Sequence, residues 1–252
     1  MDRDEATLLQ RRGLGAFFRV MARAAEGSRL AEYPGVIAAV VPSCPHRSFP
    51  NSVVYESAEE LAAAIDPLAV EYRHAGVEAW TVWVPDGDRA AVRLLEAAGH
   101  RLDAAPAAMA LELAELPEPD PGDLDWDAEA TPGEVGRIND LAYGHDEGFA
   151  AAFTRLPDPA LRLYRARVEG RPVSVAAVLD VGDDALLTFV ATDPAHRGRG
   201  LARRLSHVAV AEARDRVLRT SSLTASRLGR PVYERLGYRA FGTMQMWERR
   251  SA

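Results

Sequence analysis

One segment in the second half of the chain reads TFVATDPAHRGRGLA, from Thr188 to Ala202. An apolar run typical of a β-strand breaks at Asp193-Pro194, passes through a loop rich in arginine and glycine, and enters a helical pattern. Backbone N–H groups at a helix start point toward one spot, and the helix dipole adds to their field. Glycine suits such a loop because a Cβ would hold an anion away and because some N–H directions require a positive φ. The segment therefore predicts a binding site for phosphate or pyrophosphate.

The composition is that of an ordinary globular protein. The chain has 252 residues, of which 48% are hydrophobic and 27% are charged, enough for two small domains or one large domain. The net charge of −7 disfavours nucleic acid and an anionic membrane surface as partners. No apolar run approaches the ~18 residues of a membrane span, and residues 1–5 lack a signal-peptide pattern. We therefore expect a cytoplasmic protein that binds neither nucleic acid nor membrane.

Two residue types limit the chemistry that the chain can perform. Cys44 is the single cysteine, which excludes an intrachain disulfide and a cysteine-rich metal site. All 30 basic residues are arginine, so no lysine is present to act as a nucleophile or to form a Schiff base. We expect no metal in the mechanism.

A linker divides the chain into two predicted domains. Residues 115–125 contain three prolines and a cluster of acidic residues, which is typical of an extended polar segment. The predicted domains are therefore residues 1–114 and residues 126–252. In the first domain we expect helices at 5–25, 57–73 and 89–98 and strands at 36–41, 53–55, 80–84 and 107–113. In the second we expect helices from residue 131, at 201–217 and at 231–236, and strands at 161–168, 172–180, 185–192, 222–225 and 238–247.

The two halves share a short pattern near their ends. Leu95-Glu96-Ala97-Ala98-Gly99-His100 in the first half and Tyr233-Glu234-Arg235-Leu236-Gly237-Tyr238 in the second each end a helix at glycine before a last strand. A tandem duplication would explain this pattern. The first half has no counterpart of the loop at residues 197–202.

The loop Arg197-Gly198-Arg199-Gly200-Leu201-Ala202 fits the pattern R-x-x-G-x-A. It lacks the third glycine of a dinucleotide-binding fingerprint and the lysine of a nucleotide P-loop. A plain strand-to-helix turn is the alternative interpretation. Together with Thr224-Ala225-Ser226 and with the segment from Pro231 to Tyr238, the loop resembles the GNAT superfamily of acetyl-coenzyme-A-dependent N-acetyltransferases. The resemblance covers residues 132–247.

The resemblance implies an α/β (α+β type) fold of two GNAT-like domains, each a mixed, largely antiparallel sheet flanked by helices, with a degenerate N-terminal half. It implies that the strand before the loop splays from its parallel neighbour and that the pantetheine arm pairs with free backbone groups in the gap. The cofactor-binding residues would be Phe189, Val190, Thr192, Arg197, Gly198, Arg199, Gly200, Leu201, Ala202 and Ser226.

Tyr233 is the implied catalytic residue. It would sit near the thioester sulfur and protonate the leaving thiolate, because a coenzyme A thiolate leaves more readily once it is neutralised. A helix aromatic that packs on the cofactor or the core is the alternative. For Ser226 the alternative is a capping serine. Leu95 takes the place of Tyr233 in the first half, which predicts no cofactor there.

The general base is not assigned. The family often uses a glutamate on the strands that line the cleft, but residues 186–191 carry no carboxylate. Asp146 and Glu147 are candidates by position, with a solvated acidic loop as the alternative interpretation. The adjacent His145 could titrate near neutral pH.

These observations favour an N-acetyltransferase that transfers an acetyl group from acetyl-CoA to a primary amine by direct attack. The alternatives are a non-catalytic acyl-CoA-binding regulatory module and an adenine-nucleotide enzyme. The expected partner is a small-molecule or peptide amine, and a homodimer remains open. The first half would be structural or would shape the acceptor site.

Overall fold

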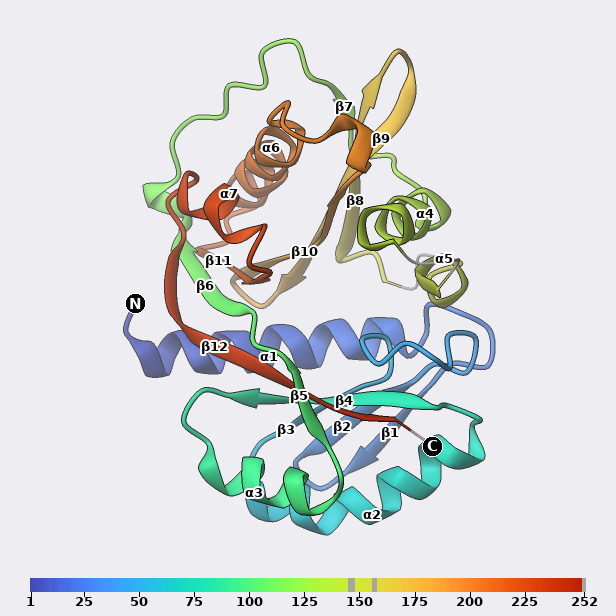
Figure 1. Cartoon of the computed structure of the whole chain (residues 1–252). Coiled ribbons are helices and arrows are strands. Elements are labelled where there is room, and N and C mark those ends of the chain that lie inside the picture. Colours follow the sequence, from blue (N-terminus) through green and yellow to red (C-terminus); the bar gives the residue numbers. More distant parts are fainter. Residues whose placement is uncertain (145–147, 156–157, 251–252) are drawn as a thin grey trace.

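A long helix, α1 (Arg3–Met21), lies between the two halves of the molecule (Figure 1). A capping box begins it, because Asp2 accepts from the Glu5 amide while the Glu5 carboxylate accepts from the Asp2 amide. Phe17 and Phe18 are buried on it. This computed structural model describes residues 1–144, 148–155 and 158–250.

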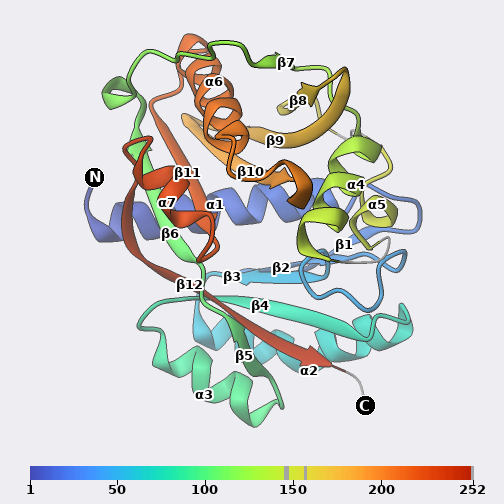
Figure 2. The same ribbon diagram turned by 45° about the horizontal axis from the view of Figure 1, so that its top comes forward.

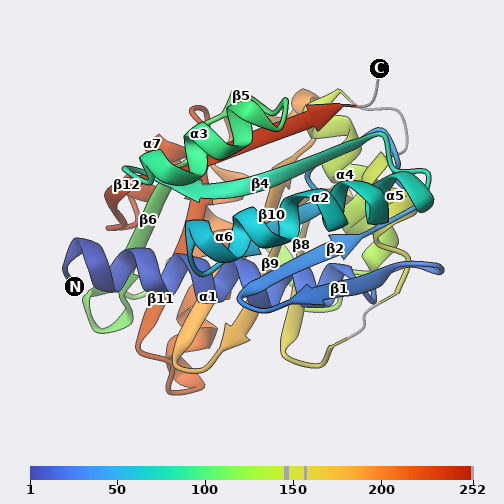
Figure 3. The same cartoon turned by 90° about the horizontal axis from the view of Figure 1, so that it is seen from below.

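The first half contains a sheet covered by two helices. Its strands are β1 (Arg29–Tyr33), β2 (Val36–Val40), β3 (Ser52–Tyr55), β4 (Ala79–Pro85) and β5 (Arg101–Ala104). Its helices are α2 (Ala58–His74), which Ser57 caps, and α3 (Arg89–Ala97), which Asp88 caps. Seen from below, α2 and α3 lie over the strands on the face opposite to α1 (Figure 3).

The last strand of the first half is β6 (Ala107–Glu112). The strands of the second half are β7 (Asp125–Asp127), β8 (Leu161–Val168), β9 (Arg171–Val181), β10 (Asp184–Thr192), β11 (Thr220–Ala225) and β12 (Arg239–Arg250). Its helices are α4 (Pro132–Tyr143), α5 (Gly148–Ala152), α6 (Leu201–Asp215) and α7 (Arg230–Glu234), and short 3₁₀ turns occupy Leu113–Glu115 and Pro194–His196.

The two halves share one twelve-stranded sheet because their last strands cross over. The order is β1-β2-β3-β4-β12-β6-β11-β10-β9-β8-β7, and β5 also pairs with β12. Strand β6, which precedes the linker, pairs with β11 of the second half. Strand β12, the last of the chain, pairs with β6 and then runs down to pair with β4 of the first half (Figures 1 and 2). Strand pairing therefore crosses the linker, and the domain boundaries at 114 and 126 stay a prediction.

Three buried clusters hold the layers together. One lies between α2, α3 and the first-half strands, and a second lies between α6 and β6 and β8–β11. The third surrounds α1 and joins both halves, with Phe17, Trp83 and Phe189 among its members. Trp80, Trp83 and Met109 lie in these clusters and are all at most 4% exposed.

The linker is fixed to α6. His207 Nε2 lies 2.8 Å from the Pro117 carbonyl oxygen, Arg204 donates to the Pro121 carbonyl at 3.0 Å, and Arg214 donates to the Leu116 carbonyl at 3.0 Å. In a flexible linker the backbone carbonyls would hydrogen-bond to water. Here three of them hydrogen-bond to side chains of α6 instead. The linker thus adds to the packing of the second half.

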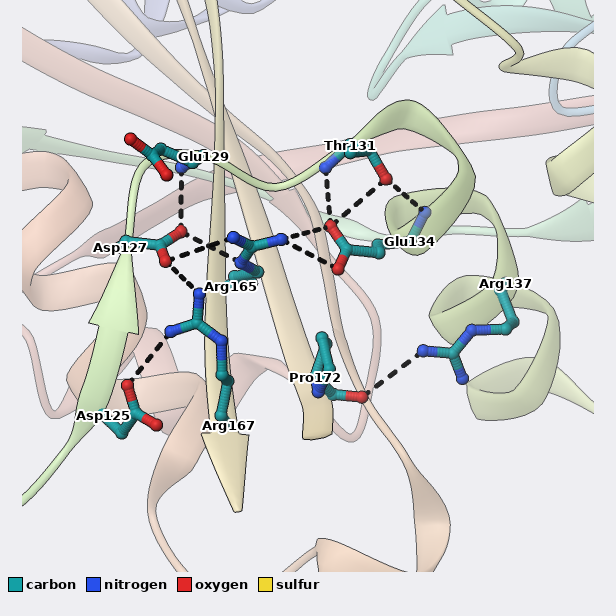
Figure 4. A network of polar contacts seen from close by, with 9 residues as sticks. All are labelled: Asp125, Asp127, Glu129, Thr131, Glu134, Arg137, Arg165, Arg167 and Pro172. Atoms are coloured by element: carbon teal, nitrogen blue, oxygen red, sulfur yellow. Dashed lines mark hydrogen bonds and ion pairs between the residues drawn. The ribbon is translucent and has the colours of Figure 1, made fainter. Parts of the chain in front are cut away.

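A network of ion pairs holds the edge strand β7 and the start of α4 on β8 (Figure 4). Arg165 donates to both carboxylate oxygens of Glu134 at 2.9 Å, and both Arg165 and Arg167 contact Asp127. Glu134 also accepts from the Thr131 amide at 2.7 Å, which completes a capping box for α4. Because these side chains are mostly shielded from solvent, this network is stronger than isolated surface pairs.

The fold class expected from the sequence is confirmed: mixed sheet segments are flanked by helices in each half. The turn between β8 and β9 closes a hairpin with positive φ at Glu169 (52°) and Gly170 (73°), the geometry of a type I′ turn. Sequence patterns missed the strands β1, β5 and β7 and the helix α5, all of which are short. Within the described part of the chain, no helix has the length and apolar character needed to cross a membrane.

Candidate active site

The parallel strands β10 and β11 pair only at their first residues. The pairing extends from Asp184–Thr220 to Leu186–Ser222 and stops there. Further along β10, its register with β9 shifts between Thr188 and Ala191, which marks a β-bulge. Phe189 lies in this bulge with φ of 49°, a left-handed conformation that is rare for a large side chain. The strands therefore separate toward their carboxyl ends and leave backbone groups of β10 without a partner on β11.

The loop after β10 turns the chain into α6. Asp193 accepts from the Ala195 amide at 2.9 Å and starts a 3₁₀ turn. Gly198 and Gly200 follow with φ of 78° and 73°, and a Cβ on either would project into open space. The first backbone bond of α6 is donated by the Arg204 amide to the Gly200 carbonyl, so the amides of residues 201–203 have no partner within the helix. The loop thus has the backbone amides without helical partners and the positive φ angles that are predicted for an anion-binding site.

A cavity of about 560 Å³ opens between this loop, the end of α4 and the start of α7. Its size is within the usual range for small-molecule sites. Nine of the predicted site residues line it: Val190, Thr192, Arg197, Gly198, Gly200, Leu201, Ala202, Ser226 and Tyr233. The structure therefore brings together residues that lie more than 40 positions apart in the sequence.

Phe189 and Arg199 do not line the cavity. The Phe189 ring stacks on Phe153 at 5.3 Å and meets Phe17 edge-on at 5.2 Å, so its side chain belongs to the core around α1. Val190, the next residue in the chain, does line the cavity. Arg199 is exposed on the loop, and no described group accepts a hydrogen bond from its side chain.

Tyr233 lies buried in the cavity wall on α7 and is 8% exposed. Its ring meets Tyr238 edge-on at 5.9 Å, and a Cβ at Gly229 would come within 3.2 Å of it. Burial, and secondly the nearby Tyr143, raise the pKa of the Tyr233 phenol above its usual value. No described residue hydrogen-bonds its hydroxyl, in contrast to Tyr238, whose hydroxyl lies 2.6 Å from Ser221 Oγ. Tyr233 is therefore a protonated phenol at neutral pH with its donor unused.

Ser226 has the capping contact that the alternative interpretation predicts. Its Oγ accepts from the Gly229 amide at 3.1 Å. The hydroxyl proton is not used by this bond, and the residue also lines the cavity. Both interpretations of Ser226 are therefore compatible with the structure.

Several cavity residues were missed by sequence reasoning. These are Ala142, Tyr143, Ala191, His196, Arg203, Leu228, Gly229, Val232 and Arg235. His196 and Arg203 flank the loop motif and could have been included on position alone. Tyr143 and Leu228 carried no such signal: each is an exposed apolar residue on a different element, and only the fold brings them to one rim.

The described lining of the cavity contains no carboxylate. The lining does include the imidazole of His196. Its Nδ1 lies 3.6 Å from a carboxylate oxygen of Asp193, a residue outside the described lining. The base candidates His145, Asp146 and Glu147 lie outside the described residues. Among the described residues, no group of three or more His, Cys, Asp or Glu side chains is placed to bind a metal ion.

The first half has the same helix end but lacks the loop. The His100 amide donates to the Leu95 carbonyl at 2.8 Å, as the Tyr238 amide does to that of Tyr233 at 3.1 Å. Gly99 and Gly237 both have positive φ, at 83° and 96°. Strand β3 ends at Tyr55, however, and α2 begins at Ala58, so no glycine loop separates them. Leu95 is fully buried in the first-half core.

Comparison with known proteins finds similarity to one family in the second half. Residues 145–248 match the family model of the acetyltransferase (GNAT) domain. The chain is similar in structure to a GCN5-related N-acetyltransferase from Kribbella flavida, with a TM-score of 0.69, 19% identity and 96% of each chain covered. It is also similar to a GCN5-related N-acetyltransferase from Sphaerobacter thermophilus, with a TM-score of 0.60, 18% identity, and 93% of this chain and 91% of that chain covered.

A third similar structure is a tandem GNAT protein from the clavulanic acid biosynthesis pathway, with a TM-score of 0.55, 15% identity and 95% of each chain covered. At these identities the similarity concerns the fold. No curated protein sequence matches the chain.

Proposed function

We propose that the protein transfers an acetyl group from acetyl-CoA to a primary amine, since residues 145–248 match the family model of the acetyltransferase (GNAT) domain. The observation that carries this proposal is the cavity itself, in which the glycine loop, the splayed end of β10 and the buried phenol of Tyr233 meet. Acetyl-CoA supplies an activated thioester, so the protein has to bind, orient and handle protons.

The residues of the cavity suit a large anionic co-substrate. Its described lining carries His196, Arg197, Arg203 and Arg235 and no acidic side chain. The positive φ of Gly198 and Gly200 turns backbone amides toward the cavity, and a Cβ there would fill the space an anion needs. We assign the pyrophosphate of CoA to the amides of residues 198–202 and the pantetheine to the unpaired edge of β10 at Val190 and Thr192.

Tyr233 is the proposed general acid. It lines the cavity from α7, and its raised pKa keeps the phenol protonated at neutral pH. It can therefore donate a proton to the sulfur of the departing thiol. Backbone amides at the β10 bulge, next to Phe189 and Val190, are the proposed donors to the carbonyl oxygen of the acetyl group.

A direct reaction has a kinetic signature. If the amine attacks the bound thioester, initial rates follow a sequential pattern and no acetylated enzyme accumulates. Ping-pong kinetics together with a covalently acetylated protein by mass spectrometry would contradict direct attack. The matching test of the co-substrate is thermal unfolding: CoA, and not ATP, is expected to raise the melting temperature.

The lack of a carboxylate in the described lining favours one second candidate, an acyl-CoA-binding module without catalysis. Tyr233→Phe separates the two. An acceptor panel scored by release of free thiol first identifies an amine that the wild type acetylates. If the protein is an enzyme, the variant then loses about a hundredfold in kcat, the low end for a general acid, while its Kd for acetyl-CoA stays within about twofold, since only one hydroxyl is removed.

The control for this experiment is Tyr238→Phe. Tyr238 is a neighbouring buried tyrosine that does not line the cavity, and its loss of the Ser221 contact should lower stability and leave kcat unchanged. Equal kcat in the wild type and Tyr233→Phe would show that Tyr233 is not the acid. Binding of acetyl-CoA without any thiol release in the wild type would favour the module.

A further inference from the structure

The side chain of Arg197 joins two elements at the edge of the cavity. Its Nε donates to the carbonyl of Thr192 at 3.3 Å, and its Nη2 donates to the carbonyl of Ala142 at 2.5 Å. Thr192 is the last residue of β10, and Ala142 lies in the last turn of α4. The planar guanidinium spans both carbonyls at once, which a lysine ammonium on its flexible stem cannot reproduce. Two of its donors are thus committed to protein carbonyls.

The turn that Arg197 holds carries Tyr143. Helix α4 ends at Gly144 with φ of 67°, so Tyr143 is its final residue and follows Ala142 directly. Tyr143 lines the cavity together with Tyr233, although 53% of it is exposed. The surrounding protein raises the pKa of the Tyr143 phenol, and the charge of Arg197 opposes this shift. Both phenols line the same cavity, and Tyr143 contributes to the raised pKa of Tyr233.

The position of Tyr143 in the cavity lining indicates which part of a bound acetyl-CoA it would contact. The cavity is lined both by Gly198 and Gly200, with the open amides of the loop, and by Tyr143 and Tyr233. If the pyrophosphate binds at the loop amides, the acylated pantetheine has to lie along the rest of this lining, which includes both tyrosines. An aromatic ring with a hydroxyl can pack on such a chain and also hydrogen-bond its amide or thioester groups. Nothing in the R-x-x-G-x-A pattern assigns a role to this residue.

We propose that Tyr143 contacts the acyl-pantetheine portion of acetyl-CoA beside Tyr233, and that Arg197 is a positioning residue that holds Tyr143 there. This inference rests on the proposed function. It changes the expectation for Arg197, whose side chain acts by fixing the end of α4 against the end of β10. A role in attracting phosphate belongs instead to backbone amides and to other arginines that line the cavity, such as Arg203.

The test compares two ligands that differ in their phosphates. Acetyl-CoA is measured by calorimetry, and S-acetylpantetheine, which lacks the pyrophosphate, is measured by competition against it. Tyr143→Ala should weaken both ligands about tenfold, the loss expected for one aromatic contact. Tyr143→Phe keeps the ring and should fall between this variant and the wild type. Arg197→Lys keeps the positive charge but loses the planar guanidinium that bridges the two carbonyls. It should therefore weaken the binding of both ligands by the same factor as Tyr143→Ala.

The double variant Arg197→Lys/Tyr143→Ala should bind no more weakly than Tyr143→Ala alone, because the two residues act as one unit. Arg203→Gln is the matched control, because Arg203 also lines the cavity: it should weaken the binding of acetyl-CoA and leave the binding of S-acetylpantetheine unchanged. Circular dichroism checks that each variant is folded, and if Arg197→Lys is not, Tyr143→Phe and Tyr143→Ala still test the contact.

Two outcomes overturn the inference while the wild type still binds acetyl-CoA. One is that both Tyr143 variants bind both ligands as the wild type does. The other is that Arg197→Lys binds normally and Arg197→Gln loses only acetyl-CoA, which would make Arg197 a phosphate ligand. Failure of the wild type itself to bind acetyl-CoA would instead contradict the proposed function.

Discussion

A single buried carboxyl shows how the residues around β10 and β11 couple stability to pH. Asp184 is 1% exposed, and its two oxygens accept from Thr220 Oγ1 at 2.8 Å and from Ser222 Oγ at 2.6 Å. Burial raises its pKa from 3.8 to about 6, and the two hydroxyls oppose the shift. The folded protein therefore holds this proton more tightly than the unfolded chain does. The corresponding stabilisation is complete below about pH 4 and is lost as the pH rises through about 6.

We predict that Asp184→Asn removes this pH dependence. The amide is neutral and similar in shape, so the variant should equal or exceed the wild type in unfolding free energy at pH 8, by up to roughly 3 kcal/mol, and should lose the advantage below about pH 4. Urea unfolding from pH 4 to pH 8 measures the difference. An unchanged difference between the two proteins across this range would mean that Asp184 titrates normally in the fold.

At the scale of elements, the loop between β10 and α6 owes its shape to two glycines with positive φ. Gly200→Ala should cost about 1 kcal/mol of stability because alanine is strained at φ of 73°. It should also weaken acetyl-CoA binding by at least about tenfold, since the new Cβ projects into the space assigned to the pyrophosphate.

The control for Gly200→Ala is Gly170→Ala. Gly170 has the same φ of 73° and the same open surroundings, but it lies in the hairpin turn between β8 and β9, away from the cavity. Both variants should melt at similarly reduced temperatures, and only Gly200→Ala should lose acetyl-CoA. Equal affinities in the two variants would place the anion elsewhere.

How far the sequence predicts each element depends on the length of its pattern. The strand at 161–168 and the helices from 201 and from 89 have clear periodicity, and the structure has them within a few residues. β7 is three residues long and exists because Arg165 and Arg167 hold its aspartates, a contact that no local pattern contains. The loop, Ser226 and Tyr233 could be brought to one site from sequence because their motif order is distinctive. Tyr143 could not, because only the packing of α4 against β10 places it there.

At the scale of the whole molecule, the exchange of last strands makes each half depend on the other. β6 completes the sheet of the second half, and β12 completes that of the first, while α1 fills the core between them. Neither half can lose its sheet without exposing a strand edge and apolar surface of the other. The half that carries the cavity is therefore stabilised by a half that has no glycine loop of this kind.

We predict that the protein unfolds in one cooperative transition. Leu68→Ala, in the first-half core, removes a fully buried side chain and should cost about 2–5 kcal/mol. It should lower the single melting temperature and, by the same interval, the temperature at which acetyl-CoA binding is lost. Scanning calorimetry with parallel binding measurements tests this. Two separate transitions, with binding retained above the first, would show that the halves are independent.

The central claim is that one site, in the second half, holds acetyl-CoA. Titration of acetyl-CoA into the wild-type protein by isothermal calorimetry tests it most directly, since the measurement yields affinity and stoichiometry without an acceptor. We predict saturable binding with one acetyl-CoA per chain, abolished or strongly weakened in Gly200→Ala and retained in Gly170→Ala. No binding, or two equivalents per chain, would contradict the account.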